Sequence, residues 1–278
     1  MPATLPRSTP IALSDAQLSA YTAFAHALAD AAGAAIRPHF RARLAVDDKG
    51  GTRGYDPVTI ADRAAEDAMC RLITATHPDH GVFGEEHGAR AGSTGLTWVL
   101  DPIDGTRAFI TGMPLWGTLI ALYDGSRPVL GVMDQPYTGE RFVGSRFGAE
   151  LVTREGRTAL AVRPCAGLGE AVLYSTHPDL FVPGAERAAF DALCKQVRMT
   201  RYSGDCYAYC MLAAGHLDLI VESGLQPYDV AALIPIIEAA GGHITDWHGG
   251  PCHDGGRVLA AGDARVHAQA LAALAQVP

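Results

Sequence analysis

The chain has 278 residues, of which 48% are hydrophobic and 19% charged, and its formal net charge is -8. This composition is that of a folded globular protein, and the acidic balance argues against a nucleic-acid partner, because nucleic-acid binding requires basic side chains that neutralise phosphates. We see no apolar run as long as a membrane span and no secretory signal in residues 1–15, so we expect no membrane partner.

Six cysteines are scattered along the chain without the spacing of a disulfide framework, which favours a cytoplasmic protein. Cys206 and Cys210 are four residues apart and could begin a zinc site on one helix face. Their apolar neighbours favour core packing instead.

The first half of the chain predicts two helices and then a series of antiparallel strands. Residues 1–13 are expected to be a loose tail. Ser14 is a suitable N-cap for an alanine-rich helix that reaches about residue 40. The glycine-rich segment 47–55 is expected to form a mobile flap, and it precedes a helix over 60–76. Strands are expected at 81–86, 98–100, 115–123, 128–134 and 140–144.

The second half alternates strands and helices, which is typical of an α/β arrangement. Strands are expected near 171–175, 197–202, 217–221 and 257–261, and helices near 185–195, 204–215, 229–240 and 263–275. Pro235 should kink the helix that contains it. We therefore expect one domain over residues 1–278, with an α+β lobe at 14–150 and an α/β lobe at 151–278.

The stretch Trp-Val-Leu-Asp-Pro-Ile-Asp-Gly-Thr, residues 98–106, carries the clearest chemical signal. A proline directly after Asp101 should end the strand there, and Asp104 follows across a tight turn. Two carboxylates with a backbone carbonyl between them suit a hard divalent cation. If residues 107–110 are helical, the free N–H groups at their start could hold a phosphate. The alternative is an ordinary turn, since Asp-Pro and Asp-Gly are common turn dipeptides.

Other acidic residues stand at the predicted ends of strands and starts of helices: Asp62, Glu85, Glu86, Asp205 and Asp229. For Asp205 and Asp229, helix capping is an equally good explanation of a carboxylate at a helix start. Gathered in one crevice, such groups would repel one another and would need cations to be stable.

Four parts of the chain, in this order, resemble the inositol monophosphatase family: residues 56–62, 84–86, 98–106, and 227–229 with 238–242. The resemblance covers about residues 14–275. It implies a layered α-β-α-β-α sandwich, an Mg²⁺-dependent and typically lithium-sensitive phosphomonoesterase, a small phosphorylated substrate and a homodimer.

The resemblance also implies two or three Mg²⁺ ions and names the residues that would hold them. The first ion would be surrounded by Glu85, Asp101, the carbonyl of Ile103 and Thr106, the second by Asp101, Asp104 and Asp229, and a weaker third by waters on Asp62 and Glu85. Thr106 and Glu85 could orient and deprotonate the attacking water, while the N–H groups of Gly105 and Thr106 hold phosphate oxygens. Glu86 is not expected to be a ligand. Lys49 is a candidate for a lysine that the family often has in the flap.

Residues 104–121, 203–209, 222–229 and 260–263 are similar to the histidinol-phosphate phosphatase branch of that family. Asp205 and Glu222 lie where the family contacts the leaving alcohol, and two acids there would attract the cationic end of L-histidinol phosphate, a substrate of histidine biosynthesis. Glu222 could instead be an exposed acid at a strand end. Tyr207 and Tyr209 cannot both face a pocket from one helix.

Two alternatives to this substrate stay open. An inositol phosphate or a nucleotide 3′-phosphate would suit the same family. A protein that binds a metal or ligand without catalysis is a reading from another class, and the complete set of acidic residues argues against it.

Overall fold

The computed structural model describes residues 4–43, 46–48 and 57–277. Most of the expected flap, including Lys49, lies outside these ranges. Within them, β1 (Val46–Asp48) pairs antiparallel with β2 (Pro57–Thr59) in a small separate sheet. In this part of the chain no helix is long and apolar enough to cross a membrane.

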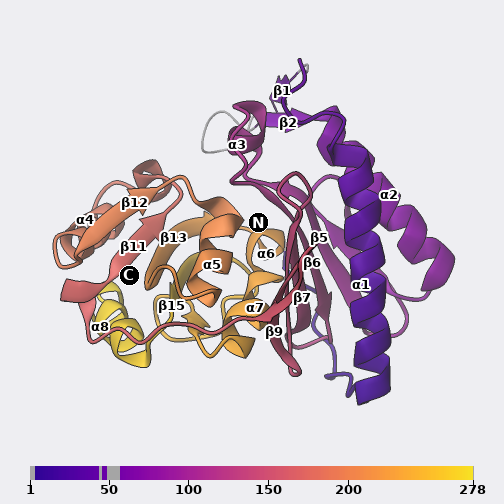
Figure 1. Ribbon diagram of the computed structural model, residues 1–278. Coiled ribbons are helices and arrows are strands. Elements are labelled where there is room, and N and C mark those ends of the chain that lie inside the picture. The colour runs from indigo at the N-terminus through magenta and orange to yellow at the C-terminus, as the bar shows by residue number, and fades with distance from the viewer. Residues whose placement is uncertain (1–3, 44–45, 49–56, 278) are drawn as a thin grey trace.

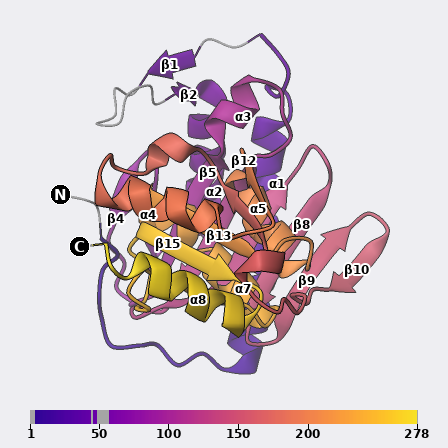
Figure 2. The same cartoon turned by 90° about the vertical axis from the view of Figure 1, so that its left-hand side faces the viewer.

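Helices and sheets alternate in five layers, which confirms the expected α-β-α-β-α sandwich (Figure 1). An outer helical layer covers one face of an eight-stranded sheet, and a central helical layer separates this sheet from a five-stranded one. A third helical layer covers the far face of the five-stranded sheet (Figure 2). From the first layer to the last, the helices are α1 (Asp15–Ile36) and α2 (Ile60–Thr76); α5 (Asp205–Ala213), α6 (Pro227–Val230) and α7 (Leu233–Ala239); and α4 (Ala185–Cys194) and α8 (Ala264–Leu274).

The first sheet has the strand order β10-β9-β8-β7-β6-β5-β3-β4 and is antiparallel except where β3 runs parallel to β5. The strands are β3 (Gly81–Gly84), β4 (Gly88–Arg90), β5 (Thr97–Asp104), β6 (Gly117–Tyr123), β7 (Pro128–Gln135), β8 (Glu140–Ser145), β9 (Gly148–Thr153) and β10 (Gly156–Ala159). The division of the lobes expected at residue 150 falls inside β9, and this sheet continues to Ala159.

The second sheet has the order β12-β11-β13-β15-β14, in which β11 is parallel to both of its neighbours. Its strands are β11 (Val172–Ser175), β12 (Met199–Tyr202), β13 (Leu219–Leu225), β14 (His243–Thr245) and β15 (Gly256–Ala261). Short 3₁₀ helices at Leu168–Glu170 and Pro178–Leu180 flank β11. The expected alternation of strands and helices in this half is confirmed.

Local signals place the first helices well. Ser14 caps α1 through a capping box with Gln17, as its side chain predicts. The helix ends at Ile36 rather than near residue 40, and its buried face packs against α2 and the eight-stranded sheet.

The prediction that Asp101 ends a strand is wrong. Strand β5 continues through the proline to Asp104, with Asp101 opposite Leu119 and Asp104 opposite Gly117. Three steps along β5 therefore match two along β6, so one extra residue bulges out of the ladder. The bulge accommodates the proline, which has no N–H to donate.

The predicted helix over 229–240 is two helices. α6 ends at Val230 and α7 begins at Leu233, so Pro235 lies in the first turn of α7, where a missing N–H costs no helical hydrogen bond. Their chain packs directly on two glycines paired across β7 and β8: a Cβ on Gly131 would lie 1.9 Å from the carbonyl oxygen of Ala232, and one on Gly144 would lie 2.3 Å from Cα of Ile236. The glycine pair thus lets the α6–α7 segment lie close against the sheet.

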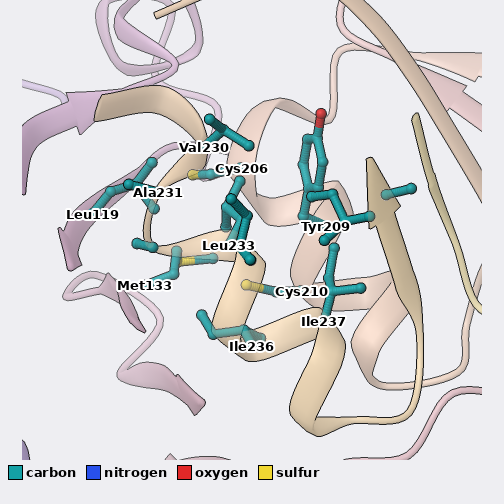
Figure 3. Close-up of a cluster of buried hydrophobic side chains, with 14 of the residues drawn as sticks. Leu119, Met133, Cys206, Tyr209, Cys210, Val230, Ala231, Leu233, Ile236 and Ile237 are labelled. Carbon is teal, nitrogen blue, oxygen red and sulfur yellow. The ribbon is translucent and has the colours of Figure 1, made fainter. Parts of the chain in front are cut away.

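The central helical layer buries both cysteines of α5. Cys206 and Cys210 lie among Met133, Leu233 and Ile236 (Figure 3), are free thiols, and have pKa values raised by burial. Core packing is therefore the role of this pair, as their apolar neighbours predict.

Candidate active site

One edge of the eight-stranded sheet gathers acidic residues. β3 and β5 are parallel, so their carboxyl ends meet at the same edge. Glu85 directly follows β3, and its N–H donates to the carbonyl of Leu100 at 3.2 Å. Asp101 and Asp104 occupy the bulged end of β5. The register of two neighbouring strands therefore brings these three side chains to one place.

Asp229 reaches the same edge from the central helical layer. It lies in the first turn of α6, where its Oδ2 accepts a hydrogen bond from the Gln226 N–H at 2.7 Å. One carboxylate oxygen each from Asp101, Asp104 and Asp229 lie within 4.8 Å of one another. Asp229 can therefore cap α6 and belong to the acidic cluster at once, because a carboxylate has two oxygens.

Burial and mutual repulsion act together on these groups. Burial raises the pKa of Asp101 well above its usual value, and the nearby Glu85, Asp104 and Asp229 raise it further. Burial and then Asp104 raise the pKa of Asp229 in the same way. Without a cation, this cluster of like charges favours protonation of its members.

The donor set fits a hard divalent cation. Asp101 is 2% exposed, and its Oδ1 has no hydrogen-bond partner among the described residues. A buried carboxylate oxygen without a partner is costly unless something positively charged meets it. All the clustered ligand atoms are carboxylate oxygens, the atoms that Mg²⁺ prefers.

Thr106 begins the short helix α3 (Thr106–Ile110), so the expected helix after the acidic turn is present. The Thr106 hydroxyl donates to the carbonyl of Ile103 at 3.1 Å. Gly105 precedes it with a φ of 86°, and a Cβ there would lie 3.2 Å from Cβ of Asp205. The backbone can therefore turn tightly between the acidic cluster and α3.

Next to the cluster lies a cavity of about 180 Å³. Its described lining contains four carboxylates and no lysine, arginine or histidine: Asp104, Thr176, Leu180, Asp205, Cys206, Tyr209, Glu222, Ser223, Gly224, Leu225, Asp229 and Leu233. Asp205 and Glu222 thus share one cavity with two members of the acidic cluster. Burial, followed by Asp104 and Glu222, raises the pKa of Asp205 well above its usual value.

Glu222 is a buried residue of the cavity wall rather than an exposed strand-end acid, with 3% exposure. Its Oε1 accepts hydrogen bonds from the Thr176 N–H at 2.8 Å and the Thr176 hydroxyl at 2.6 Å. Burial raises its pKa to about 7, although the Thr176 hydroxyl acts against this. Sequence reasoning missed Thr176, which directly follows β11, where the carboxyl end of a parallel strand is a common place for ligand-binding residues.

The two tyrosines of α5 point to different places, as the helical spacing predicts. Tyr209 lines the cavity with its hydroxyl 3.4 Å from Glu222 Oε2. Tyr207 instead donates to Glu140 on β8 at 2.8 Å.

Asp62, another expected site residue, is not a member of the three-carboxylate group. It is 1% exposed, and its Oδ2 accepts from the N–H and hydroxyl of Thr59 at 2.9 and 2.6 Å in a capping box at the start of α2. The described contacts therefore assign Asp62 a capping role. Burial raises its pKa, the hydrogen bonds from Thr59 act against this rise, and the nearby Glu86 adds to it.

Comparisons with known proteins agree with this fold. The profile of the inositol monophosphatase family matches residues 17–277. A bifunctional phosphatase of Arabidopsis thaliana, IMPL2, chloroplastic, is 44% identical over 96% of this chain and 78% of its own length. A histidinol-phosphatase of Mycobacterium tuberculosis is 35% identical over 84% of this chain and 90% of its own length.

A solved structure of an inositol monophosphatase from Zymomonas mobilis superposes with a TM-score of 0.83 at 42% identity, and covers 95% of this chain and 100% of that one. Fold and sequence thus point to one group of proteins. The chain belongs to the inositol monophosphatase family, a family of Mg²⁺-dependent phosphatases.

Proposed function

We propose that this protein is a Mg²⁺-dependent phosphomonoesterase that hydrolyses L-histidinol phosphate to L-histidinol and phosphate. The observation that carries this proposal is the cavity beside the acidic cluster, whose described lining offers four carboxylates and no basic side chain. Such a cavity favours an alcohol with a positive charge over a neutral one.

Asp205 and Glu222 are the residues that would meet the cationic end. Histidinol phosphate bears an ammonium group and an imidazole, whereas the ring of an inositol phosphate offers only neutral hydroxyls. Thr176 holds one oxygen of Glu222 in place through two hydrogen bonds. A carboxylate fixed in this way loses little rotamer freedom when a ligand binds.

The acidic edge would supply the phosphoryl-transfer chemistry. Glu85, Asp101, Asp104, Asp229, the Ile103 carbonyl and Thr106 would hold two Mg²⁺ ions, and Asp62 would help to hold a third through water. Bound Mg²⁺ neutralises charge on the phosphate and lowers the pKa of water. Thr106 and Glu85 would orient the attacking water and take its proton, and the N–H groups of Gly105 and Thr106 would hold phosphate oxygens.

The relatives support this substrate and also name the alternative. Proteins called histidinol-phosphatase from Chlorobaculum parvum and Mycobacterium tuberculosis are each 35% identical to the chain. An inositol monophosphatase of Mesembryanthemum crystallinum is 34% identical. Hydrolysis of an inositol phosphate is therefore the second candidate, favoured by the similarity to the Zymomonas mobilis structure.

The decisive experiment measures phosphate release from L-histidinol phosphate, inositol 1-phosphate and glycerol phosphate at fixed Mg²⁺. We expect histidinol phosphate to have the highest kcat/KM, and no turnover in excess EDTA. Turnover of inositol 1-phosphate much faster than histidinol phosphate would replace the first proposal with the second candidate. Full activity after dialysis against EDTA would contradict the metal mechanism.

The cavity acids are tested by Glu222→Gln and Asp205→Asn. A charge-assisted contact contributes roughly 1.5–3 kcal/mol, so each change should lower kcat/KM for histidinol phosphate about tenfold or more. Glycerol phosphate has no ammonium group and should be affected less. Glu140→Gln is the matched control, because Glu140 bonds Tyr207 outside the cavity. Equal losses on both substrates would show that the two acids are structural.

We also propose that the protein is cytoplasmic and acts as a homodimer. All six cysteines are free thiols, which suits a reducing compartment. The dimer is inferred from the family resemblance, and light scattering of the purified protein measures it directly.

A further inference from the structure

Glu66 is a fully buried carboxylate that the mechanism above does not use. It lies on α2, one turn after Asp62, and is 0% exposed. Its Oε2 accepts a hydrogen bond from the Glu86 N–H at 2.8 Å, and its Oε1 accepts one from the His87 N–H at 2.9 Å. Burial raises the pKa of Glu66, while these two backbone hydrogen bonds act against that rise. Both oxygens thus bind the turn that follows Glu85.

The chain leaves room for this contact at Gly84. A Cβ there would lie 2.0 Å from Oε1 of Glu66 and 2.5 Å from its carboxyl carbon. No side chain larger than hydrogen fits while Glu66 keeps its place. The end of β3 therefore accommodates this carboxylate closely.

Glu85 is held between two supports. On the sheet side its N–H donates to the carbonyl of Leu100, and on the helix side Glu66 binds the next two N–H groups. The Glu85 carboxyl in turn lies close enough to Asp101 to raise the pKa of Asp101 further, after burial. The direction of the Glu85 side chain into the acidic cluster thus depends on the backbone of residues 85–87.

We propose that Glu66 is a positioning residue for the metal site, which aims Glu85 by binding the N–H groups of Glu86 and His87. The inference rests on the proposed metal role of Glu85. Glu66 touches neither metal nor substrate. It acts by removing the freedom of a three-residue turn that would otherwise move the Glu85 carboxylate.

A carboxylate is the side chain that this position requires. Two N–H donors face two oxygens, and a glutamine would offer one oxygen and one NH₂ group, which cannot accept. Glu66→Gln therefore leaves one buried N–H opposite another donor. Changes to groups that orient metal ligands typically cost 10–100-fold in metal affinity.

The test uses Glu66→Gln and, as a second route to the same disturbance, Gly84→Ala. Mg²⁺ binding is measured by calorimetry on the full chain without substrate, and amide hydrogen exchange is followed at residues 85–88. We expect a Mg²⁺ dissociation constant about tenfold higher and faster exchange at Glu86 and His87. Asp67→Asn is the matched control, because Asp67 is exposed and its carboxylate meets the His87 ring, at 2.9 Å, rather than the backbone of the turn.

The outcomes separate this inference from the proposed function. Unchanged Mg²⁺ affinity in Glu66→Gln, with wild-type binding intact, would overturn the positioning role alone. Equal loss in Asp67→Asn would also overturn it, since the turn would then be sensitive to any change. A wild-type protein that binds no Mg²⁺ would overturn the proposed function, and the exchange rates at Glu86 and His87 would then decide whether Glu66 holds the turn. Thermal unfolding of each variant shows that the affinities compare folded proteins.

Discussion

Asp104 accepts a hydrogen bond from one neighbour and is repelled by two others of the same charge. Its Oδ2 accepts a hydrogen bond from the Cys206 N–H at 2.7 Å, whereas Asp101 and Asp229 lie close by with the same charge. The hydrogen bond keeps the side chain in place, and the repulsion makes its ionised form costly without a cation. Function and stability therefore make opposite demands on this residue.

Asp104→Asn is expected to raise stability and abolish catalysis. The amide oxygen can still accept from Cys206, while the removed charge relieves Asp101 and Asp229. A gain of about 1 kcal/mol would raise Tm of the metal-free protein by roughly 2–4 °C, and activity should fall by orders of magnitude. Differential scanning calorimetry in EDTA and phosphate release in Mg²⁺ measure the two effects. A lower Tm with activity retained would contradict the assignment of Asp104 to a metal.

At the scale of one element, the five-residue helix α3 is held mainly from outside. Phe109 of α3 packs with Phe40 and Trp116 at ring-centroid distances of 5.4 and 5.0 Å. Arg41 donates to the carbonyl of Gly112 at 3.0 Å and to the Tyr137 hydroxyl at 2.5 Å. So short a helix has little stability of its own, so these contacts with distant parts of the chain fix its place.

Arg41→Ala should loosen α3 and weaken phosphate binding for every substrate. We expect KM to rise about fivefold for histidinol phosphate and glycerol phosphate alike, an effect of about 1 kcal/mol. Variants at Asp205 and Glu222 should instead discriminate between those substrates. Steady-state kinetics give the comparison, with Arg43→Ala as control for an exposed arginine nearby. An unchanged KM would show that α3 keeps its place without Arg41.

At the scale of the whole molecule, residues 4–13 join the two sheets, and the prediction of a loose tail is wrong for these residues. Asp254, in the loop before β15, accepts hydrogen bonds through its carboxylate from the Leu5 N–H and the Arg7 guanidinium. The Ser8 N–H donates to Gly125, between β6 and β7. Leu5 is 2% exposed in the central core.

Leu5→Ala is expected to lower the unfolding free energy by about 2 kcal/mol and Tm by roughly 4–8 °C. The Leu5 side chain is buried among residues that are far from it in the sequence. A smaller side chain should therefore weaken the packing between the two sheets. Activity at 25 °C should persist, because Leu5 lies outside the acidic cavity. Thermal unfolding measures Tm, and Thr9→Ala, a change at an exposed neighbour, is the control. Equal Tm values for the two variants would show that Leu5 does not stabilise the contact between the sheets.

Short-range signals account for much of the fold that was predicted. Ser14 predicts the start of α1, and the alternation of strands and helices in the second half predicts its α/β layers. The elements that the sequence did not predict correctly are polar or irregular strands. β9 and β10 are partly exposed strands at a sheet edge, so their sequence shows little apolar alternation. The continuation of β5 past a proline depends on a bulge, which its partner strand β6 makes possible.

The sequence by itself determined which chemistry is present. Its acids stand at strand ends and helix starts, and the order of the motifs identifies the family, because these are properties of neighbouring residues. Only the tertiary structure decided which groups meet. Glu222 and Thr176, which form a hydrogen bond, are 46 residues apart in the sequence, and Leu5 and Asp254 are 249 residues apart. Contacts over such separations depend on the packing of complete sheets, which no local stretch of sequence specifies.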